Sequence, residues 1–188
     1  MSQVISFEQQ AVARLRARLG AAEEANEDLI AFARGHSDAV ASINQAVLEA
    51  VEAPTIEALL DAVTGRWPRI LGIDTVAIAL IVGPRGFRAD ADAVERVEPA
   101  FVEKMIAKLE PVRVESVASG HLLFGTRSRA FVRAQALIRI DGPAPYPRGI
   151  LALGQKTEIA VDSSHGSALL HFLGQVIAAN IRRFVATA

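Results

Sequence analysis

The sequence predicts an α+β fold, with a mostly antiparallel sheet of five or six strands, flanking helices and a long N-terminal helix before them. Two aliphatic runs indicate the sheet: residues 73–82 are rich in Val and Ile, and residues 149–154 have glycine at both ends. A third observation indicates a closing helix, because apolar residues recur every three or four positions after Ser163. A last strand followed by a helix that packs back on the sheet completes a small α+β domain.

The composition narrows the class of protein. Of the 188 residues, 51% are apolar, which is enough for a substantial core, and the net charge is −1. Such a chain has no overall attraction to nucleic acid or to an acidic membrane. It contains no cysteine, which excludes disulfides, thiolate metal sites and cysteine nucleophiles. Its longest apolar run, 76–82, is too short to cross a bilayer. We therefore expect a cytoplasmic protein without membrane insertion.

The first segment has the pattern of a dimerising helix. Ser6 and Gln9 have the spacing of a capping box, which predicts that a helix starts there. Between residues 12 and 50, the a and d positions of one heptad frame are apolar except for Asn26 and His36. We expect residues 1–52 to form a coiled-coil dimerisation helix, which Gly35 could divide in two. The residues expected at the interface are Val12, Leu15, Leu19, Asn26 and Leu29. The alternative is an amphipathic helix that lies on its own domain.

The α+β domain should occupy residues 53–188. Thr55 can cap a helix that ends at Gly72. The run 73–82 is apolar throughout, so both faces of this strand should be buried, and its hairpin partner should begin at Phe87. The acidic stretch 90–98 matches no calcium-binding loop and is expected to be a solvated connection.

The second half of this domain supplies the remaining elements. Residues 98–109 read as a helix, and residues 112–115 alternate as in a short strand. Residues 116–133 are the least regular part of the sequence. Strands are expected at 134–140 and 149–154, and the last helix at about 163–185.

No catalytic motif is recognisable, and the four histidines (36, 121, 165 and 171) are too scattered to share a metal, so we expect no metal site and no cofactor. Segment 113–133 could form a ligand site, since two of its arginines stand beside Thr126 and Ser128 and could hold a carboxylate or phosphate. The candidate ligand-binding residues are Arg113, His121, Arg127 and Arg129. Alternatively, these arginines belong to a surface loop or pair with acids of a second subunit.

Two other functions stay open. Six arginines between residues 111 and 150 give that stretch a local positive charge, which a protein- or nucleic-acid-binding adaptor could use. Ser119, His121 and Glu115 could also be assembled into a hydrolase triad, although nothing in their spacing requires it.

Several short motifs together resemble a known family. They are Arg14-Leu15-Arg16, Asn26 with Leu29-Ile30, Leu123-Phe124-Gly125, and Gly149 to Gly154. The chain resembles the bacterial domain of unknown function family 484, which is similar to GAF sensor domains, from about Val12 to its end. After Gly154 it departs from its relatives, which tend to have a serine, an aspartate and an aromatic residue where Gln155, Lys156 and Val161 stand here.

The resemblance implies a GAF-like sheet and dimerisation, but it carries no established catalytic or binding residues. The cysteine needed for covalent bilin attachment is absent. We expect a non-enzymatic, homodimeric sensory or regulatory module of the cytoplasm, with a signalling role and a small molecule or a protein as its partner.

Overall fold

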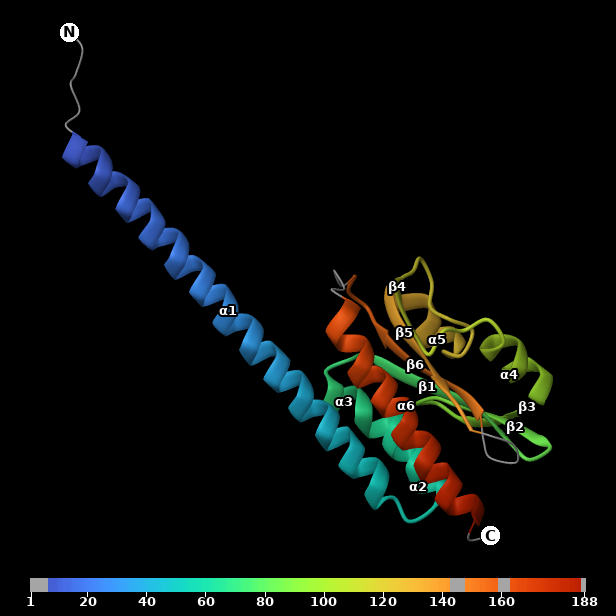
Figure 1. Ribbon diagram of the computed structural model, residues 1–188. Helices are drawn as coiled ribbons and strands as arrows, with labels where there is room; N and C mark the ends of the chain where they lie inside the picture. The colour runs from blue at the N-terminus through green and yellow to red at the C-terminus, as the bar shows by residue number, and fades with distance from the viewer. Residues whose placement is uncertain (1–6, 143–147, 159–162, 187–188) are drawn as a thin grey trace. The chain divides into compact units, whose positions relative to one another are not determined.

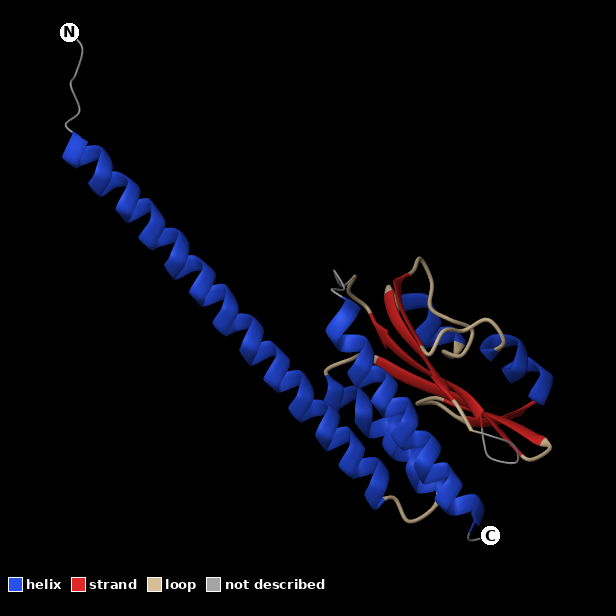
Figure 2. Cartoon of the chain, viewed as in Figure 1, coloured by secondary structure: helices blue, strands red, loops and turns tan. Residues whose placement is uncertain are grey.

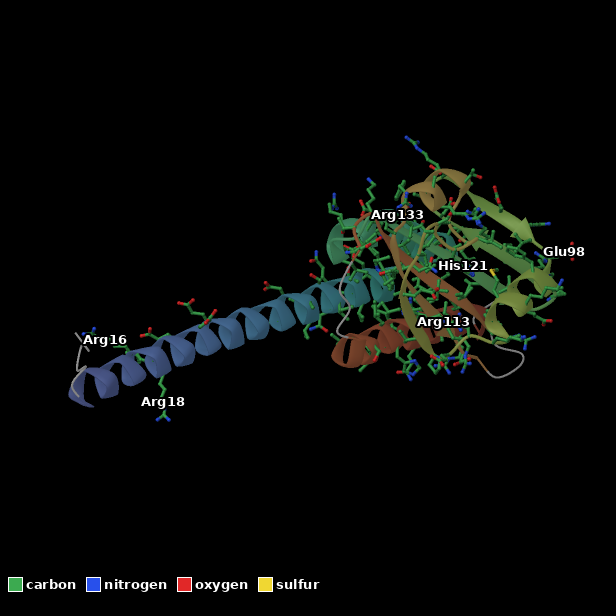
Figure 3. The ribbon with its side chains drawn as sticks, turned by 90° about the horizontal axis from the view of Figure 1, so that it is seen from above. Arg16, Arg18, Glu98, Arg113, His121 and Arg133 are labelled. Carbon is green, nitrogen blue, oxygen red and sulfur yellow. The ribbon has the colours of Figure 1, made fainter. Side chains whose placement is uncertain are left out.

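The computed structural model describes residues 7–142, 148–158 and 163–186 (Figure 1). Contacts divide the chain into two units, Met1–Ala41 and Ser42–Ala188. Helix α1 (Phe7–Glu52) is one uninterrupted helix and crosses this boundary, so Gly35 does not divide it. Its charged side chains at Arg16 and Arg18 are exposed and project away from the helix (Figure 3).

The second unit is built on a six-stranded sheet with the order β3-β2-β1-β6-β5-β4. Its strands are red in Figure 2. Every neighbouring pair is antiparallel, which confirms the expected kind of sheet. The strands are β1 (Thr75–Val82), β2 (Arg85–Ala89), β3 (Val94–Val97), β4 (Val112–Ser116), β5 (Ala134–Ile140) and β6 (Arg148–Gln155). The two aliphatic runs form the centre of the sheet, because β1 and β6 pair along almost their whole length, from Thr75↔Gly154 to Ile81↔Arg148.

Most of the helices of this unit cover one face of the sheet. They are α2 (Ile56–Asp61), the π-helix η1 (Ala62–Arg66), α3 (Trp67–Leu71) and α6 (Ser163–Ala186) (Figure 1). Trp67 is completely buried and donates its indole N–H to the carbonyl oxygen of Ala46 at 2.9 Å. This bond joins α3 to the last turns of α1, and it satisfies the polar atom of a large apolar side chain.

The last turns of α1 belong to this compact unit rather than to a separate helical segment. Ile43, Ala46 and Ala50 are buried in the same core cluster as Trp67. Ile43 and Ala50 occupy d positions of the heptad frame, and here they pack within the domain. This part of the helix thus has the packing of the alternative, an amphipathic helix that lies on its own domain.

The opposite face of the sheet is covered by α4 (Pro99–Ile106) and α5 (Thr126–Phe131), as Figure 1 shows. A second core cluster lies between them and the sheet, and it includes Val102 of α4, Phe124 and Val132. Leu123 and Phe124 are almost fully buried, which explains the apolar pair in an otherwise irregular segment. Both faces of the central strands are thus covered, as the uniform apolar pattern of 73–82 predicts.

Glycines act at specific points of this fold. Gly72 and Gly83 have positive φ angles of 66° and 58°, and Gly72 ends α3 in the left-handed conformation. At Gly149, a Cβ atom would lie 2.1 Å from the carbonyl oxygen of Ala79, because β6 passes very close to β1 there. The N-cap at Thr55 is confirmed, since its side chain accepts a hydrogen bond from the N–H of Ala58 at 3.2 Å.

Two expected irregular segments are ordered. The acidic stretch after residue 90 is not only a solvated connection, because Val94–Val97 forms the edge strand β3 against β2. The stretch 116–133 contains the short helix α5. An exposed edge strand and a six-residue helix lack the apolar periodicity by which longer elements are recognised.

Candidate functional site

A buried ion pair stands at the end of β2, on the face covered by α4 and α5. Arg88 and Asp90 are 9% and 7% exposed, and their side chains form a short, direct salt bridge. Arg88 also donates through Nε to the carbonyl oxygen of Leu123 at 2.8 Å, and through Nη1 to Glu95 at 3.2 Å. The guanidinium therefore has partners in the β2–β3 turn, on β3 and in the loop that precedes α5.

The Asp90 carboxylate is equally well satisfied. Its Oδ1 accepts hydrogen bonds from the backbone N–H groups of Asp92 and Ala93, both at 3.0 Å, and so shapes the turn between β2 and β3. Its Oδ2 accepts the N–H of Gly125 at 3.1 Å in addition to the salt bridge. A buried carboxylate is tolerated only with such partners, so this residue joins the β2–β3 turn to the start of α5.

Gly125 permits this close approach. A Cβ atom at this position would lie 2.7 Å from Oδ2 of Asp90, so any side chain would push the carboxylate away. Gly125 is also the N-cap residue of α5, and its carbonyl accepts the N–H of Arg129 at 2.9 Å. The helix that carries the candidate arginines is thus held in place by a buried charge on the sheet.

A cleft of ≈ 660 Å³ opens beside this ion pair. We call it the α4–α5 cleft; its walls include Arg88, Asp90, Phe101, Leu122, Arg127 and Arg129. Phe101 comes from α4, and Leu122 is 55% exposed in the loop before α5. Apolar surface next to exposed guanidinium groups suits a small molecule that has an acidic group and an apolar part.

The structure brings two of the four predicted ligand-binding residues together. Arg127 and Arg129 both stand on α5 and line the cleft. Arg129 donates through Nε to the carbonyl oxygen of Gly120 at 3.1 Å, whereas Arg127 is exposed and makes no hydrogen bond or ion pair within the described residues. Arg113 does not line the cleft; it is exposed on β4 and donates to the carbonyl oxygen of Lys108 at 3.3 Å.

His121 lies outside the cleft as well, in the loop between β4 and α5 (Figure 3). Its backbone N–H donates to the Gln135 side chain at 2.7 Å, and Gln135 donates in turn to Glu115 at 2.8 Å. Its Nδ1 accepts the N–H of Leu123 at 3.3 Å. The imidazole is therefore part of the structure that positions Leu123.

The environment of His121 lowers its pKa below the usual value. Burial of the ring is the main cause, and the Glu115 carboxylate opposes it. The guanidinium groups of Arg129 and Arg113 contribute further lowering. A neutral ring is the form that can accept a hydrogen bond at Nδ1, so the pKa and the hydrogen bond agree.

The hydrolase arrangement is not assembled. The Ser119 hydroxyl donates to the carbonyl oxygen of Arg129 at 3.3 Å, and Glu115 receives its hydrogen bond from Gln135 rather than from His121. Within the described residues there is no group of three or more His, Asp or Glu side chains that could hold a metal ion. In the same part of the chain, no helix is both long and apolar enough to span a membrane.

Sequence reasoning missed Arg88 and Asp90, the two residues that organise the cleft. One signal was available: an arginine and an aspartate two positions apart share a face of a strand and can pair. Their burial could not be predicted from the sequence, because Leu123 and Gly125, which bond to them, come from a segment far along the chain.

Comparison with known proteins agrees with this architecture. The family model described as "Protein of unknown function, DUF484" matches residues 1–186. No curated protein matches the chain.

Several solved structures are similar. The GAF domain of A. aeolicus nlh2 in an inactive state aligns with a TM-score of 0.56 and 11% identity, over 79% of this chain and 98% of that one. The GAF domain of a protein described as a sensor histidine kinase, from Pseudomonas syringae pv. tomato, has a TM-score of 0.50 and 14% identity, over 82% and 94%. The chromophore-binding domain of a bacteriophytochrome from R. palustris has a TM-score of 0.52 and 13% identity, over 78% and 62%. The chain therefore belongs to the DUF484 family of proteins of unknown function, and its sheet and flanking helices have the fold of GAF domains.

Proposed function

We propose that this chain is a non-enzymatic sensory or regulatory module that forms homodimers through α1 and binds a small carboxylate- or phosphate-bearing molecule in the α4–α5 cleft. The observation that carries the proposal is the exposed guanidinium of Arg127, which lines the cleft without a partner among the described residues. Arg129 stands two positions along the same helix, and Phe101 and Leu122 offer apolar surface beside it. Two guanidinium groups can hold an acidic group by charge-assisted hydrogen bonds.

The dimer part of the proposal rests on the heptad pattern before Ala41. Leu19, an a position, is 60% exposed in the single chain, so it is available for contact with a second copy. At Val12, Leu15, Asn26 and Leu29 the structure describes the helical backbone but not the side chains.

The adaptor alternative is weaker because the arginines of 113–148 are largely engaged within the domain. Arg139 pairs with Asp141 at 2.8 Å, and Arg148 forms a short ion pair with Glu103. Arg133 donates to three backbone carbonyls, those of Ala118, Ala130 and Val132. Guanidinium groups used in this way form no continuous free surface for phosphates.

Native mass spectrometry of gently purified protein tests both parts at once, because it reads the subunit count and any retained small molecule. A panel of small carboxylates and phosphates, screened by thermal unfolding, then tests the site. A ligand at a hundredfold excess over its Kd should raise Tm by roughly 5–10 °C.

The Arg127→Ala variant should lose most of that shift, since it removes the free guanidinium and leaves the buried ion pair intact. Arg85→Ala is the matched control, because Arg85 is an exposed arginine on the same domain that does not line the cleft. If both variants keep the full shift, or if no acidic molecule in the panel stabilises the protein, the ligand-binding part of the proposal fails.

A further inference from the structure

A second cavity lies on the other face of the sheet from the α4–α5 cleft. It is a groove of ≈ 420 Å³ between the α2–η1 helix and the turn that connects β2 to β3. Leu80 and Phe87 form part of its floor, and they are register partners on β1 and β2. Leu80 belongs to the core cluster that contains Trp67, whereas Phe124 of the cleft belongs to the other cluster. The groove therefore lies on the other face of the sheet, and the two cavities meet at the β2–β3 turn, where Asp90, Asp92 and Ala93 line both. Its proposed ligand does not depend on the function proposed above.

One wall of the groove is a single face of the helix. The residues that line it, at 56, 57, 60, 61, 64 and 65, recur at helical spacing. The wall runs into the π-helix η1, and π-helical turns within helices are frequently associated with functional sites. Thr64 is buried and bonds its hydroxyl to the carbonyl oxygen of Leu60 at 2.9 Å, so its polar group is satisfied within the helix.

Gly65 leaves the end of this wall open. A Cβ atom there would meet only Oδ1 of Asp61, at 3.6 Å, which is ordinary contact, and its φ angle is not positive. A larger side chain at this position can therefore be accepted by the helix and would project into the groove.

The rim of the groove is acidic. Glu57, Asp61 and Asp92 are exposed, and none of their side chains makes a hydrogen bond or ion pair within the described residues. No Lys, Arg or His is among the groove's described lining residues. The fourth acid, Asp90, is neutralised by Arg88 on the opposite face. An apolar floor below three unpaired carboxylates complements a cation that has an apolar body.

We propose that this groove binds a small organic cation, an aliphatic or aromatic amine whose apolar part lies over Leu80, Val82 and Phe87. The ammonium group is placed among the rim carboxylates, and the ring of Phe87 can add a cation–π contact. The groove has the volume of a small-molecule pocket. The three carboxylates select against anions of the same shape, in contrast to the arginines of the α4–α5 cleft.

The test uses two linear probes of six carbons each and opposite charge, hexylamine and hexanoate, titrated against the full chain by NMR. Hexylamine should shift the resonances of Gly65, Ala91 and Val94, and hexanoate should not. Raising the ionic strength should weaken the hexylamine effect, because exposed charges are screened.

Variants locate the effect. Asp61→Asn should weaken hexylamine binding about three- to fivefold, the range expected for one exposed ion pair. Glu110→Gln is the matched control, because Glu110 is an exposed acid without a partner in the described residues and does not line the groove. Gly65→Leu should abolish binding by filling the groove, and a favourable helix former at that position preserves the fold.

Three results overturn the proposal: hexanoate shifts the same resonances equally, Asp61→Asn binds hexylamine as the unmodified chain does, or Gly65→Leu folds normally and still binds. Arg127→Ala separates the two sites, since it should leave hexylamine binding unchanged.

Discussion

At the scale of single residues, the Arg88–Asp90 pair is the interaction on which the cleft depends. Asp90 accepts hydrogen bonds from three backbone N–H groups and from Arg88. Replacing it with alanine would leave the buried guanidinium without its closest counter-charge and the turn without its acceptor. We expect Asp90→Ala to lower the free energy of unfolding by about 3–5 kcal/mol, as measured by urea denaturation.

Asp92→Ala is the control for this change. Asp92 is also an aspartate of the β2–β3 turn, but its side chain is exposed and only its backbone N–H is bonded to Asp90. Its replacement should alter stability by less than about 0.5 kcal/mol. Similar losses for the two variants would contradict the role assigned to Asp90.

His121 makes stability depend on pH. Its pKa is lowered in the folded protein, mainly through burial, so the unfolded chain binds the proton more readily. The contribution is fully present above the ordinary histidine pKa of about 6.5, and it is lost as the pH falls from there through the lowered pKa. Thermal unfolding between about pH 7.5 and pH 5 should therefore show a steeper decline for the natural protein than for His121→Gln. Parallel curves for the two proteins would exclude this assignment.

At the scale of elements, the close approach of β6 to β1 explains the glycine that begins the central aliphatic run. A side chain at Gly149 would collide with the backbone of Ala79, which cannot move without breaking the sheet. Gly149→Ala should lower the free energy of unfolding by about 1–3 kcal/mol, the range for overpacked sites.

Gly35→Ala is also a glycine-to-alanine substitution, but it should raise stability rather than lower it. Gly35 is exposed in the middle of α1, and an added Cβ atom would meet nothing within 4 Å. Alanine there should favour the helix by roughly 1 kcal/mol. Chemical denaturation of the two variants measures the change in the free energy of unfolding in each case. A Gly149→Ala protein that is as stable as the natural one would show that β6 can move away from β1 at little cost.

At the scale of the whole molecule, the proposed dimerisation through α1 has the clearest test. Introducing acids at the a and d positions in Leu15→Asp, Leu19→Asp should abolish the dimer, because an apolar seam does not tolerate buried, unpaired carboxylates. The subunit count is read by native mass spectrometry or sedimentation.

The matched control is Ala17→Asp, Ala31→Asp, which adds the same charge at f positions on the outer side of the heptad frame. This protein should remain dimeric. If the Leu15 and Leu19 variant is also dimeric, α1 is not the interface, and if both are monomeric, added charge rather than position is responsible.

Much of the sheet domain could be predicted from the sequence alone. The runs 73–82 and 149–154, the cap at Thr55 and the amphipathic last helix were recognisable, because each is encoded by neighbouring residues with one periodicity. The resemblance carried by the short motifs indicated the family.

Only the tertiary structure decided where the cleft lies and what holds it. The residues that meet at Asp90 come from segments 35 positions apart, so no local pattern distinguishes this buried carboxylate from its exposed neighbours. For the same reason no local pattern shows that Arg127 and Arg129 line the cleft whereas Arg113 and His121, close to them in the sequence, do not. Periodicity shows which side of a helix or strand is apolar. The pairing of charged side chains depends instead on which elements come into contact, and these contacts form only when the helices pack on the two faces of the sheet.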